Sequence, residues 1–190
     1  MTGKMIELET QRLRLIALTT KQLKLYLADT ERLERELGYP VSRAILTQVV
    51  RRAIEIKISK MAAVPEASHP WYTYWLIVVR DEPYGAGLAG FKGYPDSRGE
   101  AEIGYGIDPA HQSRGYMTEA ARALIAWGFE EPNCRSIVAP GTLKSNAASN
   151  RVLEKAGMVV YGESDETLSW RIDRGQHVRL GQTSERDYGF

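Results

Sequence analysis

The sequence has little of what a secreted or membrane-spanning protein needs. Its one cysteine, Cys134, has no partner for a disulfide within the chain, which fits a reducing compartment. The longest apolar run, Trp75–Val79, is far shorter than the roughly 20 residues of a membrane-spanning helix, and the start of the chain lacks the apolar core of a signal peptide. These absences predict a cytoplasmic protein.

An excess of charge of either sign is also missing. The 25 basic residues nearly cancel the 24 acidic ones, so bulk charge attracts neither nucleic acid nor an anionic membrane. The three histidines, His69, His111 and His177, share no metal-ligand spacing with each other or with Cys134, which argues against a zinc site. We therefore expect a ligand held by a local site, with no nucleic acid, membrane or metal.

What the chain does have is the composition of one globular domain. Of its 190 residues, 43% are hydrophobic and 26% are charged. The apolar spacing predicts strands at 12–15, 73–80, 88–94, 101–107, 135–139, 158–162 and 167–172, and helices at 19–38, 42–64, 113–130 and 145–156. This order predicts a mixed α/β domain over residues 1–174 with an antiparallel middle, followed by a polar tail at 175–190 that frays from about residue 174.

Local signals mark the ends of several of these elements. Thr19 or Thr20 and Ser42 are expected to cap the first two helices, and Ser145 the last one. Gly38 and Gly157 stand where a glycine closes a helix by adopting a positive φ.

One glycine motif must be set aside. Gly85, Gly87 and Gly90 match the dinucleotide-binding pattern G-x-G-x-x-G, but another strand pattern follows them where that fingerprint needs a helix. We interpret these glycines as a hairpin turn.

The segment Ile103–Ala120 carries more information. It joins a strand end to a helix start through a tight turn at Gly115, and the first turn of a helix offers unpaired N–H groups and a positive dipole end. A phosphate suits that place, although the same pattern also fits a strand-turn-helix with no ligand. The spacing of a P-loop is absent, which argues against a nucleotide bound with magnesium.

Within this segment, Gln112–Met117 resembles the Q/R-x-x-G-x-G/A pyrophosphate loop of the GNAT superfamily of acetyl-CoA-dependent N-acetyltransferases. Thr118–Ala120 continues it in the style of the ribosomal-protein N-terminal acetyltransferase branch, and LETQRLRLIAL, AEIGYGI, LKSNAASNRVLEKAGM and TLSWRI are similar to that branch in the same order. The resemblance spans residues 6 to 174 and implies a GNAT-like mixed, mostly antiparallel sheet flanked by helices. Met117 departs from the pattern, which prefers Gly or Ala, so its side chain must turn away from the cofactor.

The resemblance also implies which residues hold acetyl-CoA. The main chain of Tyr105, Gly106 and Ile107 would pair with the pantetheine arm. The main-chain amides that would hold the pyrophosphate belong to Ser113, Arg114, Gly115, Tyr116, Met117 and Thr118. Asn146 matches a second cofactor contact; its alternative role is to cap the helix at 145–156.

Acetyl transfer to an amine needs a neutral amine, a stabilised oxyanion and a proton for the departing thiolate. Ser149 lies three residues after Asn146 and matches the N-x-x-S arrangement that the similar branch uses near the sulfur. The resemblance therefore makes it the candidate partner of the thiolate; the alternative is a local helix hydroxyl. Glu102 is the candidate base, which would take the proton of the amine directly or through water. The alternative is a solvated carboxylate at the edge of a strand. His111 is a second candidate base or a packing residue, and main-chain donors near residues 105–107 could serve the oxyanion.

The resemblance implies an N-acetyltransferase that moves an acetyl group from acetyl-CoA to a primary amine by direct attack on the thioester. An α-amine, with a pKa of about 8, is neutral far more often than a lysine amine at about 10.4, which favours a protein N-terminus or another amine of low pKa. A polyamine, an aminoglycoside and an amino-acid derivative are the alternative acceptors. The alternative is a non-catalytic acetyl-CoA-binding sensor or partner-presenting module. We expect a monomer or a homodimer.

Two further sets of residues are expected to have structural roles. The aromatic cluster of Trp71, Tyr72, Tyr74 and Trp75 is expected in the core, with an acceptor pocket as the alternative. Cys134 has no catalytic context and is expected to be a small, partly buried hydrophobe.

Overall fold

The computed structural model describes residues 6–178, which form two compact units. The first unit contains the described residues up to 94 together with 104–120, and the second contains 95–103 and 121–178. In chain order the elements are β1 (Glu7–Glu9), β2 (Leu13–Ala17), α1 (Thr20–Ala28), α2 (Thr30–Leu37), α3 (Gln48–Ala62), η1 (Glu66–Ser68), α4 (His69–Tyr72), β3 (Trp75–Val79), β4 (Tyr84–Phe91), β5 (Glu100–Ile107), η2 (Pro109–His111), α5 (Tyr116–Gly128), β6 (Ser136–Leu143), α6 (Ala147–Lys155), β7 (Val159–Glu163) and β8 (Thr167–Asp173).

The strands lie where the apolar spacing predicts them, with two differences: β1 is not among the expected strands, and β4 spans Tyr84–Phe91 in place of 88–94. In the first unit the order is β1-β2-β3-β4-β5, and the pairs from β1 to β4 are antiparallel; in the second it is β5-β6-β8-β7, where β5 and β6 are parallel and the others antiparallel. β5 contributes its first half to the second unit and its second half to the first. The expected mixed, mostly antiparallel α/β architecture is therefore confirmed. Among residues 6–178, no helix has the length and apolar character to cross a membrane.

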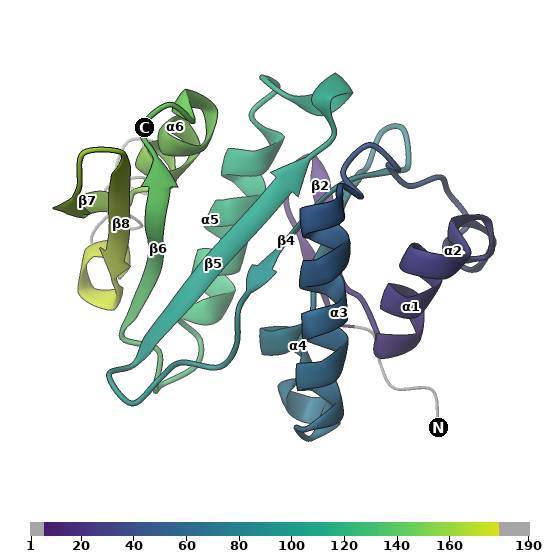
Figure 1. The fold of residues 1–190 in the computed structure, drawn as a ribbon, viewed down its shortest axis with the longest axis horizontal. Helices are drawn as coiled ribbons and strands as arrows, with labels where there is room; N and C mark the ends of the chain where they lie inside the picture. Colours follow the sequence, from purple (N-terminus) through teal and green to yellow (C-terminus); the bar gives the residue numbers. More distant parts are fainter. Residues whose placement is uncertain (1–5, 179–190) are drawn as a thin grey trace, which may run out of the picture. The chain divides into compact units, whose positions relative to one another are not determined.

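The prediction of a single helix at 19–38 is wrong. The chain forms two helices there, α1 and α2, which lie next to each other (Figure 1). Thr19 caps α1 through a capping box with Gln22, and Gly38 closes α2 at φ 82°, as expected. Asp29 interrupts the helix because its carboxylate accepts a hydrogen bond from the Arg32 amide at 3.0 Å and so caps α2.

Three other expectations about element ends are corrected. α3 begins at Gln48 behind the cap Thr47, not at Ser42, because the Ser42 amide donates to the Gly85 carbonyl at 2.8 Å and keeps this segment beside β4. α5 begins at Tyr116, three residues later than expected, and α6 is capped by Asn146 in place of Ser145. Gly157 adopts φ 91° at the end of α6, as expected.

The glycines of the discarded motif do not form the turn, which lies at residues 80–83; they lie inside β4. They permit close approach of neighbouring chain: a Cβ built on Gly87 would lie 2.7 Å from the Gly106 carbonyl oxygen, and one on Gly90 would lie 2.6 Å from the Thr73 carbonyl oxygen. A strand, β5, follows them as expected.

The core of the first unit is built from apolar side chains of β2, β3, β4 and the helices α1 to α3. Trp71 and Trp75 are buried, with Trp71 against Phe91 at 4.7 Å between ring centroids and the Trp75 indole N–H donating to the Pro70 carbonyl at 3.0 Å. The two tryptophans thus pack in the interior, which supports the core interpretation of this aromatic cluster.

Lys57 on α3 is a buried cation of the first unit. Its Nζ donates to the carbonyl oxygens of Phe91 at 2.6 Å and Thr73 at 3.1 Å, and it lies 4.5 Å from the centroid of the Tyr74 ring. Burial lowers the pKa of Lys57 from its ordinary 10.5 to about 7, and the charges of nearby lysines act in the same direction.

In the second unit, Cys134 is fully buried, and this burial raises the pKa of its thiol to about 11. Residues 174–178 are helical, and the Arg174 guanidinium donates to the carbonyl oxygens of Phe129, Glu131 and Cys134. The described start of the expected tail is therefore anchored, whereas residues 179–190 lie outside the described part of the chain.

Candidate functional site

The end of β5 presents main chain that is not covered by side chains. Gly104 and Gly106 lie two residues apart and so share one face of the strand. A Cβ built on either glycine would meet no atom within 4 Å among the residues the structure describes. Tyr105 and Ile107 are half-buried between and after them. A ligand can therefore approach the backbone of β5 here.

The loop that follows begins with a local anchor at Asp108. Its carboxylate accepts hydrogen bonds from the Ala110 amide at 2.8 Å and from the Tyr84 hydroxyl at 3.0 Å. The Asp108 amide donates to the Ala86 carbonyl on β4 at 2.8 Å. These bonds end the strand and fix the direction in which the loop leaves it.

The loop then turns twice through left-handed backbone before α5 starts. Ser113 has φ 60° and Gly115 has φ 79°, and residues 112–115 are exposed. Ser113 is the described residue other than glycine with a positive φ, a conformation that is costly and concentrated at functional sites. The first turn of α5 comes directly after this exposed loop, so its unpaired N–H groups and positive dipole end suit an anion.

Met117, which departs from the family pattern, fits this arrangement. The residue is only 6% exposed, so its side chain packs inward on the first turn of α5, as the departure from the pattern requires.

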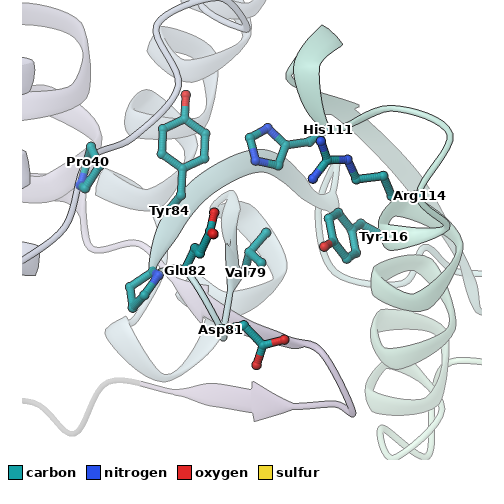
Figure 2. A pocket seen from close by; sticks show the side chains of 9 residues that line it. Pro40, Val79, Asp81, Glu82, Tyr84, His111, Arg114 and Tyr116 are labelled. Atoms are coloured by element: carbon teal, nitrogen blue, oxygen red, sulfur yellow. The ribbon is translucent and has the colours of Figure 1, made fainter.

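A pocket of about 680 Å³ lies beside the loop within the first unit. Figure 2 shows Arg114 and Tyr116 on one side of it and Pro40 and Tyr84 on the other. The His111 ring stacks on the Tyr84 ring with 4.9 Å between centroids, and its Nδ1 is buried without a hydrogen-bond partner among residues 6–178. This stacking supports a packing role for His111.

The second unit holds the candidate residues of α6. The Asn146 side-chain oxygen accepts a hydrogen bond from the Ser149 amide at 3.1 Å, so Asn146 does cap the helix, the alternative role considered from the sequence. Asn150 fixes the same turn, because its amide group donates to the Leu143 carbonyl at 2.9 Å and accepts from the Trp170 indole at 3.0 Å.

Glu102 also lies in the second unit, half-buried on β5 and opposite Val138 of β6 in the parallel register. Residues 105–107 and 113–118 thus belong to the first unit, on β5 and on the loop and helix that follow it, whereas Asn146 and Ser149 are hydrogen-bonded to each other in the second.

Sequence reasoning missed two residues that contact the loop, Arg12 and Glu119. The Arg12 guanidinium is paired with the Glu119 carboxylate at 2.7 Å and donates to the Arg114 carbonyl at 2.9 Å. The run LETQRLRLIAL contains Arg12, but no local spacing connects it with a residue on α5.

Comparison with known proteins gives the class of this domain. The sequence profile described as Acetyltransferase (GNAT) domain matches residues 12–159. The chain belongs to the GNAT acetyltransferase family, and it is an acetyl-CoA-dependent acetyltransferase. It is 30% identical over 166 residues to the uncharacterized N-acetyltransferase YjdG of Bacillus subtilis (strain 168), covering 87% of this chain and 97% of that one.

Solved structures share the fold. The ribosomal-protein-S5-alanine acetyltransferase from Vibrio fischeri matches with a TM-score of 0.62 at 18% identity, over 88% of this chain and 96% of that one. RimL, a ribosomal L7/L12 alpha-N-protein acetyltransferase solved in complex with coenzyme A, matches with a TM-score of 0.61 at 18% identity, over 90% and 98%. The resemblance inferred from the sequence is thus confirmed at the level of family and fold.

Proposed function

We propose that the chain transfers the acetyl group of acetyl-CoA to a primary amine, with the cofactor held by the end of β5 and the loop after it. The observation that carries this proposal is the exposed loop at residues 112–115, with left-handed backbone at Ser113 and Gly115 directly before α5. In this arrangement the amides of residues 113–118 bind the pyrophosphate, and the main chain of Tyr105, Gly106 and Ile107 pairs with pantetheine. The uncovered face at Gly104 and Gly106 supports such an approach.

Asn146 and Ser149 have separate roles in this proposal. The Asn146 oxygen is engaged in the cap of α6, so the contribution of Asn146 to pantetheine binding is donation by its amide nitrogen. Ser149 donates to the departing thiolate. Glu102 takes the proton of the attacking amine, directly or through water.

The acceptor is an amine of low pKa. A neutral amine is needed for attack, and an α-amine with a pKa of about 8 supplies it near neutral pH with little help from a base. Two of the solved structures that share the fold are ribosomal-protein acetyltransferases by name, which supports the N-terminal amine of a protein as the acceptor class. Small amines of low pKa form the second class to test. The single buried cysteine supports a cytoplasmic location.

The test follows free CoA while acetyl-CoA is offered to a panel of peptides with free N-termini, matched N-acetylated peptides and small amines. We expect CoA release that depends on the free amine, and a fall of about 10²-fold to 10⁴-fold in the single-turnover rate of Ser149→Ala with cofactor affinity nearly unchanged. The N-acetylated peptides control for hydrolysis.

Binding is tested separately from chemistry. Desulfo-CoA at about 100 times its dissociation constant should raise the melting temperature by about 5 to 11 °C. A chain that binds desulfo-CoA but releases CoA with no amine of the panel would refute both proposed acceptor classes. A chain that shows no shift with millimolar ligand contradicts the assignment of the loop.

A further inference from the structure

Arg12 and Glu119 form an ordered ion pair between the chain just before β2 and the first turn of α5. The Arg12 Nε and Nη2 atoms both lie 2.7 Å from Glu119 Oε2, and the Arg12 amide donates to Oε1 at 2.8 Å. The Thr10 hydroxyl donates to the same Oε1 at 2.7 Å. The carboxylate is thus held by hydroxyl, amide and guanidinium donors, and it fixes the plane of the guanidinium.

The surroundings keep this pair charged. Partial burial acts to raise the pKa of Glu119, but the hydrogen bonds from Thr10 and Arg12 and the charge of Arg12 outweigh it, so the pKa of Glu119 is lowered overall. The Glu119 side chain is 17% exposed and that of Arg12 is 42% exposed. Because the guanidinium is exposed, water weakens the attraction between the two charges, and we expect the ion pair itself to contribute modestly to stability.

The remaining nitrogen of the guanidinium contacts the loop. Arg12 Nη1 donates to the Arg114 carbonyl at 2.9 Å, and the guanidinium carbon lies 4.9 Å from the centroid of the Tyr116 ring. A Cβ built on Gly115 would lie 3.3 Å from Arg12 Nη2. Arg12 therefore contacts Arg114 and Tyr116 and lies beside Gly115 between them.

The bond to the Arg114 carbonyl sets the direction of the next amide. In a trans peptide the C=O and the following N–H point in opposite directions, and the described chain contains no cis peptide. Because Arg12 holds the Arg114 carbonyl on its own side, the N–H of Gly115 points to the opposite side of the loop.

We propose that Arg12 is a positioning residue that orients the peptide between Arg114 and Gly115, so that the Gly115 amide donates to the pyrophosphate of the cofactor. Glu119 orients Arg12 for this task. The proposal rests on the proposed function, in which residues 113–118 bind the pyrophosphate. It requires an arginine, because a lysine keeps the charge but lacks the planar fork that joins a carboxylate to a carbonyl.

The experiment compares two ligands that differ at the pyrophosphate. The dissociation constants of CoA and of pantetheine, which lacks the pyrophosphate and adenosine, are measured for the wild type, Arg12→Lys and Glu119→Gln. We expect both variants to bind CoA about tenfold more weakly, while their affinity for pantetheine stays within about twofold of the wild type. Melting temperatures confirm that the variants are folded.

Arg80→Lys is the matched control. The Arg80 side chain is also 42% exposed and donates to the Thr10 carbonyl at 2.9 Å, so it lies near the same segment, but its partners are Thr10 and Glu9 and not the loop. It should bind CoA like the wild type.

The outcomes separate the two proposals. If Arg12→Lys binds CoA as tightly as Arg80→Lys does, or loses equal affinity for both ligands, Arg12 does not position the loop. If the wild type binds CoA no more tightly than pantetheine, the loop does not hold the pyrophosphate, and it is the assignment of the loop that fails.

Discussion

Asn146 offers a test that separates helix capping from cofactor binding, because its two side-chain atoms have different tasks. Its oxygen accepts from the Ser149 amide at 3.1 Å, and in the proposed function its nitrogen donates to pantetheine. Asn146→Ala removes both groups. Asn146→Asp keeps an oxygen for the cap, adds a negative charge at the helix N-terminus and removes the donor.

The structure sets the expected sizes. Loss of an N-cap costs about 1 kcal/mol, which lowers the melting temperature of a domain of this size by about 2 to 4 °C. Loss of one neutral hydrogen bond to a ligand costs about 0.5 to 1.5 kcal/mol, or about 2-fold to 12-fold in affinity. Asn146→Ala should therefore show both losses, whereas Asn146→Asp should keep the melting temperature and lose only the affinity.

Thermal unfolding followed by circular dichroism and calorimetry with desulfo-CoA measure the two quantities independently. Ser145→Ala, next to the cap and exposed, is the control and should change neither. An Asn146→Asp protein with unchanged affinity would refute the second role, and Asn146 would be a helix cap only.

Two further predictions concern the loop and the buried lysine. Gly115→Ala should cost about 1 to 2 kcal/mol of stability because of the φ of 79°, and should also weaken CoA binding because the new Cβ lies 3.3 Å from Arg12 Nη2. Gly141→Ala is the control: its φ is similar, 67°, but its Cβ position is open, so this variant should lose stability and keep its CoA affinity. Equal CoA affinity of the two variants by calorimetry would contradict the predicted effect on binding. The pKa of Lys57 falls from 10.5 in the unfolded chain to about 7 in the native state. Between pH 7 and pH 10.5 the unfolded chain therefore keeps a proton on Lys57 that the native state has released. The free energy of unfolding, measured by urea titration, should therefore rise with pH above 7 by up to about 1.4 kcal/mol per pH unit relative to Lys57→Met; parallel pH profiles would refute this.

The sequence predicted best where a local signal decides the structure. Thr19 and Gly38 mark helix ends through bonds and angles within a few residues, and the structure has both. Asp29 was missed although its cap is also local, because the apolar spacing continues across it. Ser42 and Thr47 are equally good caps by sequence, and a contact with Gly85 on a distant strand decides between them.

In the candidate site, too, local signals could be predicted from the sequence and distant contacts could not. The exposed turn at Gly115 could be predicted from strand, loop and helix signals in one segment. Arg12 and Glu119 could not, because they are 107 residues apart in the sequence and meet only in the folded chain. The spacing of residues predicts contacts within a few turns of helix or within one hairpin, and it cannot predict a contact between residues this far apart in the sequence.

The burial of Cys134 has a practical consequence for these experiments. The thiol is fully buried with a pKa of about 11, and no other cysteine exists in the chain. A disulfide reagent added to detect released CoA should therefore give a low background from the native enzyme. For the same reason a cysteine introduced at the exposed Gln112 would be the one thiol that a maleimide dye reaches. A fluorophore attached there, at the first residue of the loop, would follow cofactor binding in real time.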